Sequence, residues 1–125
     1  MEQEDNRGHR QRLRQRFVKQ GLDGFQDYEA LELLLQFVMR QKNMKPAAKA
    51  LIARFGSYKN ALDASVAELE SVPDIGLAGA VLLHAVKQSA ARYLQQVSRE
   101  RLLEPKNGAR RLKSNQRKME WPGTY

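Results

Sequence analysis

Cysteine is absent from the chain, and its absence excludes disulfide frameworks, thiolate zinc sites and cysteine nucleophiles. No uninterrupted apolar run approaches the roughly 18 residues that a membrane-spanning helix needs. The first ten residues, MEQEDNRGHR, also lack the apolar core of a signal peptide. We therefore expect a soluble protein that is not exported and not membrane-bound, and a cytoplasmic location is compatible with this composition.

The common catalytic motifs are absent as well. The chain has no Walker-type phosphate loop, no Gly-x-Ser-x-Gly, no His-Glu-x-x-His and no EF-hand pattern. Its two histidines, His9 and His84, lie far apart in the sequence, and no His, Asp or Glu follows or precedes His84 at helical spacing. We expect neither enzymatic activity nor a metal or cofactor.

Positive charge is in excess. The chain has 22 Lys and Arg residues against 14 Asp and Glu, a formal net charge of +8, which favours association with polyanions without defining a site. Residues 104–125 are the most charge-dense part and lack the apolar periodicity of a packed helix, so we predict a disordered basic tail there. Residues 1–6 are acidic and polar, and we expect them to be frayed.

Residues 7–103 are predicted to form one small all-α domain, a bundle of five to six helices. Apolar periodicity defines the helices, Gly21 and Gly56 end two of them, Ser57 caps another, and Ser65 with Glu68 forms a capping box. The predicted helices cover residues 7–20, 27–39, 46–55, 57–64, 65–72 and 77–103. In the last of these, one apolar face is expected to carry Leu82, Val86, Ala90, Tyr93 and Val97, with His84 on the wet side.

The first helix is strongly basic and has no acidic residue between positions 7 and 20. Leu13 and Phe17 share a stripe and are expected to dock the helix on the domain. The stripe is flanked by Arg7, Arg10 and Arg14 on one side and by Arg12, Arg16 and Lys19 on the other. This charge indicates either a bound anion or a solvated face paired with Asp27, Glu29 or Glu32.

The second helix is predicted to be the centre of the core. Asp27 is a suitable N-cap, and the only polar stripe consists of Glu29, Glu32, Gln36 and Arg40. We interpret the aromatic residues of this segment as core packing. The connector that follows adds a second basic cluster, which is either an anion site or an ordinary loop surface: Arg40, Lys42, Lys45 and Lys49.

The segment LESVPDIGLAGAVLL, residues 69–83, has the spacing of a helix-hairpin-helix. Apolar Leu69, Val72, Ile75 and Leu83 alternate with small residues at fixed offsets, and such a hairpin directs backbone N–H groups toward a phosphate at a helix N-terminus. Asp74 stands where the common pattern has glycine. Asp tolerates the left-handed backbone, but no Lys or Arg between residues 74 and 83 offsets its charge. A hairpin kept for packing alone is the alternative.

Four segments in this order resemble the N-terminal domain of the RadC family of bacterial proteins. They are GHRQRLRQRF at 8–17, DYEALELLLQF at 27–37, KPAAKALIARFGS at 45–57, and the hairpin. The resemblance covers residues 7–103. It implies a compact all-α domain with a helix-hairpin-helix-like core and an association with DNA repair.

The chain also departs from that family. RadC-family members usually continue into a JAB/MPN-type domain with a metal-binding His-x-His, an Asp and a Glu, and these are missing here. Asn43 replaces an acidic residue that the family pattern leads us to expect, and Asp74 replaces glycine. We expect a truncated or frame-disrupted copy.

Two functional interpretations follow. In the first, the domain binds DNA without sequence preference through its phosphates. In the second, it is an adaptor that docks a protein partner and does not bind DNA itself. The first interpretation assigns nucleic-acid binding to Arg10, Arg12, Arg14, Arg16, Lys42, Lys45, Ile75, Gly76 and Gly79.

Overall fold

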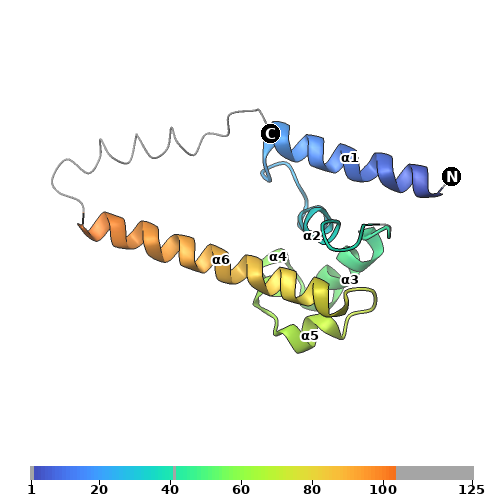
Figure 1. Cartoon of the computed structure of the whole chain (residues 1–125). Helices are drawn as coiled ribbons and strands as arrows, with labels where there is room; N and C mark the ends of the chain where they lie inside the picture. Colours follow the sequence, from blue (N-terminus) through green and yellow to red (C-terminus); the bar gives the residue numbers. More distant parts are fainter. Residues whose placement is uncertain (1, 41, 104–125) are drawn as a thin grey trace. The chain divides into compact units, whose positions relative to one another are not determined.

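The computed structural model of the protein describes residues 2–40 and 42–103. All regular secondary structure in this part is helical, which confirms the predicted all-α class. The helices are labelled in Figure 1 and occur in the order α1 (Glu2–Gln20), α2 (Asp27–Leu35), α3 (Lys45–Phe55), α4 (Tyr58–Asp63), α5 (Val66–Glu70) and α6 (Gly76–Leu103). The predicted tail, residues 104–125, lies outside the described residues.

The chain divides into two compact units, residues 1–87 and 88–125. The first unit contains α1 to α5 and the first turns of α6. The described part of the second unit, residues 88–103, is the C-terminal part of α6. Every residue of the candidate site belongs to the first unit.

Helix α2 is the centre of the first unit and packs against α1, α3 and α4 (Figure 1). Burial of long aliphatic side chains stabilises this arrangement by about 2 kcal/mol each. The predicted core residues of the hairpin segment are confirmed, because Leu69, Ile75 and Leu83 are fully buried and Val72 is 2% exposed. The largest fully buried side chains are Leu31, Leu35, Met44, Leu51, Leu69, Ile75 and Leu83.

Helix α1 begins at Glu2, so the expectation of a frayed segment up to residue 6 is wrong from Glu2 onward. It ends as predicted at Gly21, whose N–H donates to the Phe17 carbonyl at 2.7 Å with a φ of 72°. Leu13 docks the helix and is 3% exposed, whereas Phe17 is 41% exposed. The helix is therefore anchored by one residue of the predicted stripe rather than two.

Helix α2 begins at Asp27, as predicted, and ends at Leu35, before the predicted end at residue 39. Its N-cap is Gln26, whose N–H donates to Glu29 Oε1 at 2.9 Å, and not Asp27. The Asp27 carboxylate instead accepts the Tyr58 N–H at 2.9 Å and so ties α2 to α4. The helix ends at Leu35, and the N–H groups of Phe37 and Val38 form tight turn bonds with residues three positions earlier, at 3.1 Å each.

Two residues of the predicted polar stripe, Glu32 and Gln36, do not face water. Glu32 and Gln36 are 3% and 4% exposed, because α1 lies on this face of α2 and not on its apolar side. His9 of α1 pairs with Glu32 there, with 2.7 Å between His9 Nε2 and Glu32 Oε2. Glu32 is thus buried with a partner for one of its carboxylate oxygens, whereas the side-chain amide of Gln36 is buried without a hydrogen bond to any described residue.

The predicted caps of the short helices are confirmed. Ser57 Oγ accepts the Asn60 N–H at 3.1 Å at the start of α4. Ser65 and Glu68 form the reciprocal capping box at the start of α5, with bonds of 3.1 and 3.0 Å. Each cap satisfies backbone donors that a helix N-terminus leaves free.

Helix α6 buries a different face from the one predicted. Ala80 and Leu83 are fully buried, whereas Leu82 and Val86 are only partly buried and Tyr93 is 48% exposed. His84 is half-buried rather than on an exposed face. Within the described residues, no helix combines the length and apolarity that crossing a membrane requires.

Candidate nucleic-acid interface

Arg10 extends from α1 to the connection between α2 and α3. Its Nη1 donates to the Gln36 carbonyl at 3.2 Å, and its Nη2 donates to the carbonyls of Met39 and Lys42. One guanidinium thus contacts the backbone of the α2–α3 connection at three carbonyl groups. Burial, and next the positive charge of Arg14, lower the pKa of Arg10, while the charge of Glu32 acts in the opposite direction.

Lys42 pairs with Asp74, and this contact joins the α2–α3 connection to the α5–α6 turn. The sequence offered no cation near Asp74, because the nearest in chain order after it is Lys87. In the structure the cation beside Asp74 is Lys42, which lies 32 residues earlier in the chain. The charge of Asp74 is therefore offset in space, and that of Lys42 is offset as well.

The α5–α6 turn has the left-handed backbone that the sequence predicts. Asp74 has a φ of 70° and Gly76 a φ of 63°. The N–H of Ile75 donates to the Val72 carbonyl at 3.2 Å, so this amide is already used inside the turn. The free donors of the turn are those of the first residues of α6, Gly76 and Leu77, which are exposed and have no acceptor within the helix.

Gly79 serves packing in this structure. It is buried, and its N–H donates to the Ile75 carbonyl at 3.2 Å. A Cβ at this position would lie 3.0 Å from Ile75 Cγ2 and 3.3 Å from Leu35 Cδ2. The glycine lets α6 approach α2, and it presents no group to the surface.

Arg16 is held on the opposite flank of α1. Its guanidinium donates to both carboxylate oxygens of Glu29 at 3.0 and 2.9 Å and to the Gly24 carbonyl at 3.0 Å, and it stacks on the Phe25 ring at 4.2 Å. The hydrogen bonds from Arg16 are the main cause of a lowered Glu29 pKa, and the charge of Lys45 contributes to it. The predicted alternative, a basic face paired with Glu29, holds for Arg16.

Three arginines remain exposed around these contacts. Arg12, Arg14 and Arg40 are exposed, and no carboxylate among the described residues forms an ion pair with them. Arg14 lies one helical turn after Arg10, and Arg40 lies within the segment that Arg10 holds. Arg12 lies one turn before Arg16 and so belongs to the other flank of α1.

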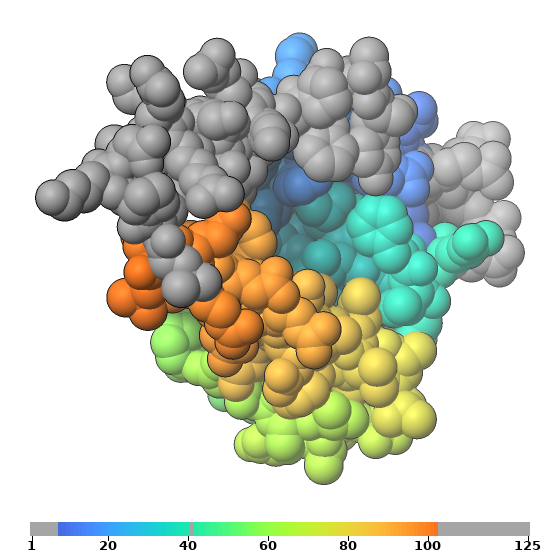
Figure 2. Space-filling model, turned by 60° about the vertical axis from the view of Figure 1, so that its left-hand side comes forward, coloured from blue at the N-terminus to red at the C-terminus, as the bar shows by residue number. Residues whose placement is uncertain are grey.

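The predicted site residues therefore form two groups. Arg10 and Lys42 meet at the α2–α3 connection, and Gly76 lies close to Met39 of the same connection. Arg14 acts on Arg10 through its charge, whereas Arg16 and Lys45 lie near Glu29. Figure 2 shows the first region, where the turquoise α2–α3 connection adjoins the yellow start of α6. A shallow surface hollow there is lined by Val38, Met39, Arg40 and Lys42.

Near this surface, sequence reasoning placed Phe37 wrongly. It was expected to pack in the core, but it is 59% exposed. The helical period that predicts its burial stops at Leu35, so Phe37 falls in the turn and points outward. The adjacent run of Arg40 and Lys42 was the available signal that this turn lies at the surface.

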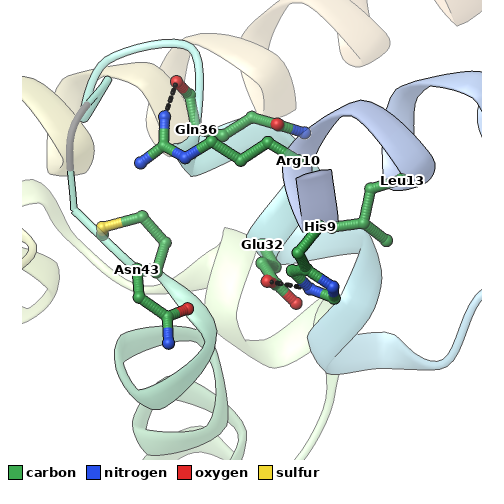
Figure 3. Close-up of a pocket in the computed structure, with 7 residues that line it drawn as sticks. His9, Arg10, Leu13, Glu32, Gln36 and Asn43 are labelled. Carbon is green, nitrogen blue, oxygen red and sulfur yellow. Dashed lines mark hydrogen bonds and ion pairs between the residues drawn. The ribbon is translucent and has the colours of Figure 1, made fainter. Parts of the chain in front are cut away.

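The enclosed pocket beside α1 is too small for a substrate. Figure 3 shows His9 and Arg10 of α1 directed toward Glu32 and Gln36 of α2, with Asn43 opposite. The cavity among them is about 10 Å³, about the space of one water molecule. In the described residues, no group of three or more His, Cys, Asp or Glu side chains is placed to hold a metal ion.

The fold and the surface together define a small all-α domain with a basic surface region. The chain is 43% identical over 76 residues to the UPF0758 protein FN0909 of Fusobacterium nucleatum, a match that covers 61% of this chain. UPF0758 is a RadC-family name, so this similarity supports a RadC-like protein. The chain spans about a third of the length of that relative, 33%. No protein-family profile matches the chain, and no solved structure matches it.

Proposed function

We propose that this domain is a non-catalytic module that binds DNA through the phosphate backbone, without sequence preference, in a RadC-like protein associated with DNA repair. The observation that carries the proposal is that Arg10 holds the connection that carries the exposed Arg40, while the exposed Arg14 lies one helical turn from Arg10 and its charge acts on Arg10. We propose a cytoplasmic location for this role.

The backbone of the site is arranged before any ligand binds. Arg10 fixes the α2–α3 connection through three carbonyl groups, so little conformational entropy remains to be lost there on binding. The exposed N–H groups at Gly76 and Leu77 add donors and the positive end of the α6 dipole. We propose that the α5–α6 segment acts as the helix-hairpin-helix of this interface.

We propose a smaller set of phosphate-contacting residues than the sequence predicts. Arg14 and Arg40 are the principal candidates, Lys42 is shared with Asp74, and Arg10 acts by positioning the segment. Arg16 already forms an ion pair with Glu29. Arg12 and Lys45, on the other flank, contribute to the general positive field rather than to the same phosphate contacts.

The test is a fluorescence titration of a labelled DNA duplex at two salt concentrations. Arg14→Glu and Arg40→Glu are compared with Lys19→Glu, which makes the same change in net charge at an exposed position of α1. We expect Arg14→Glu and Arg40→Glu to weaken binding at least about tenfold, and to reduce the salt slope by about 0.9 for each lost phosphate contact. Lys19→Glu should have a smaller effect.

Equal weakening by all three variants would contradict a local interface and leave only a diffuse positive field. Absence of binding by the wild-type chain would overturn the proposal. The adaptor role, with a protein as the partner, would then be the function to test. Far-UV circular dichroism of each variant establishes that it is folded before the comparison is made.

A further inference from the structure

Phe37 occupies an unusual position for a phenylalanine in a small domain. It is 59% exposed, and it lies in the turn after α2 rather than within a helix. Its own N–H donates to the Leu34 carbonyl at 3.1 Å, and Arg10 binds the carbonyl of the preceding residue, Gln36, at 3.2 Å. The ring is therefore presented to solvent by a backbone that is held from both sides.

The surroundings of Phe37 are cationic. Arg40 and Lys42 follow it within five residues, and with Val38 and Met39 they line the shallow hollow on this surface. In the same region, Met39 lies against the start of α6, with its Cε 3.8 Å from the position of a Cβ on Gly76. An exposed aromatic ring in the same short segment as arginine and lysine is a combination suited to unpaired nucleic-acid bases and their phosphates.

We infer that Phe37 and Arg40 bind single-stranded nucleic acid, with an unpaired base stacked on the Phe37 ring and the flanking phosphate held by Arg40. This inference rests on the proposed function and specifies its substrate. In a duplex, both faces of each internal base are covered by stacking, so Phe37 has no partner there. The two residues therefore discriminate unpaired from paired DNA by stacking rather than by base sequence.

Exposed aliphatic residues at the start of α6 suggest that a partner protein, rather than nucleic acid, could bind this surface. Leu77 is 57% exposed and Val81 is 50% exposed, and an apolar surface of a partner protein would cover them as readily as Phe37. The cations distinguish the two cases, because Arg40 and Lys42 lie in the same short segment as the aromatic ring. A stacked base requires the aromatic ring at position 37. An apolar surface of a partner protein would instead pack equally well against another apolar side chain of similar size at this position.

The experiment compares two single strands of equal charge, an oligothymidylate of about a dozen nucleotides and an abasic strand of the same length. The variants are Phe37→Leu, which keeps the apolar volume and removes the ring, and Arg40→Glu. Stacking of one base contributes enough affinity to raise binding at least about fivefold. We therefore expect the wild-type chain to prefer the oligothymidylate by at least that factor.

Phe37→Leu should lose this preference and bind both strands as the wild-type chain binds the abasic strand. Arg40→Glu should weaken binding to both strands. A spectroscopic readout uses Phe37→Trp in a Trp121→Phe background, in which the introduced indole is the only tryptophan. The oligothymidylate should quench its fluorescence, and the abasic strand should not.

Two results would overturn the inference in different ways. Equal affinity of the wild-type chain for the two strands would refute stacking and leave phosphate binding, and so the proposed function, intact. Failure of the chain to bind any DNA would refute both. A preference that survives Phe37→Leu but is lost in Leu77→Ala would assign the contact to the aliphatic surface and not to the ring.

Discussion

The side-chain amine of Lys42, in the α2–α3 connection, pairs with the carboxylate of Asp74, in the α5–α6 turn. Both side chains are about half exposed, at 55% and 48%, so the pair is open to competition from a ligand. A phosphate that approached Lys42 would meet the carboxylate of Asp74 beside it. Lys42 can therefore form an ion pair either with Asp74 or with a phosphate, and the Asp74 pair competes with phosphate binding.

Replacement of Asp74 by Asn should strengthen DNA binding. Asn tolerates the left-handed backbone at this position, where φ is 70°, and the substitution removes a negative charge and releases Lys42. Because an exposed pair contributes about 1 kcal/mol or less, we expect affinity to rise about two- to fivefold and the salt slope to steepen. Titration of labelled DNA at several salt concentrations measures both quantities.

The matched control is Asp63→Asn, which makes the same change in net charge and releases Lys59 and Lys87 on another part of the unit. An equal gain in affinity from the two variants would show that only overall charge matters. In that case the Lys42–Asp74 pair would have no specific role at the interface.

Substitutions of Arg10 and Arg14 should distinguish a residue that stabilises the fold from a residue that binds DNA. Arg10→Met removes the donors to three carbonyl groups, and we expect it to lower the free energy of unfolding by about 1–3 kcal/mol, because hydrogen bonds to charged groups are the stronger ones. Arg14→Met, one turn away and exposed, should leave stability within about 0.5 kcal/mol and weaken DNA binding. Urea denaturation followed by circular dichroism gives the stabilities. Equal stability losses would contradict the structural role of Arg10.

Gly79 should tolerate no larger side chain. The branched side chain in Gly79→Val would meet Ile75 and Leu35, since even a Cβ would lie 3.0 and 3.3 Å from their side chains. Overpacking of this kind costs about 1–3 kcal/mol. Ala78→Val, at the adjacent exposed position, is the control and should cost a few tenths of a kcal/mol through helix propensity. A similar stability for both variants would exclude Gly79 as the contact that brings α6 against α2.

The parts of the fold that the sequence predicts well are those with local causes. The Ser57 cap, the Ser65–Glu68 capping box and the glycine at the end of α1 depend on residues within one helical turn, so their types and spacing are sufficient. The left-handed backbone at Asp74 and Gly76 is also local. The apolar residues of the hairpin were predicted for the same reason, because their spacing defines a buried face.

The sequence does not predict structural features that depend on a residue far away in the chain. Glu32 and Gln36 follow the period of a solvated stripe, and only the position of α1 explains why they are buried. Helix α2 stops at Leu35 where Arg10, 26 positions before Gln36, takes up backbone carbonyls of the following segment. Phe37 then leaves the core as a consequence. The partner of Asp74 is likewise 32 residues away in sequence, and no local pattern encodes it.

The Arg16–Glu29 pair should make stability depend on pH in the acid range. Hydrogen bonds from Arg16 lower the pKa of Glu29 below its ordinary value of 4.5. A carboxyl group with a lowered pKa in the folded state stabilises the protein above its unfolded pKa, and that contribution is lost as the pH falls through the folded pKa. Glu29→Gln should therefore reduce the free energy of unfolding at neutral pH, and the difference from the wild-type chain should shrink below about pH 4.5.

A double-mutant cycle with Arg16→Met isolates the pair from the other carboxyl groups, because Asp63 and Glu68 also have lowered pKa values and both are retained in every variant. The coupling between positions 16 and 29 should be favourable at pH 7 and should weaken as the pH falls below about 4.5. Urea denaturation of the four proteins at several pH values measures it. A coupling that stays constant over this range would mean that the Arg16 contact with Glu29 is one of packing and shape, and that the carboxylate charge contributes nothing to it.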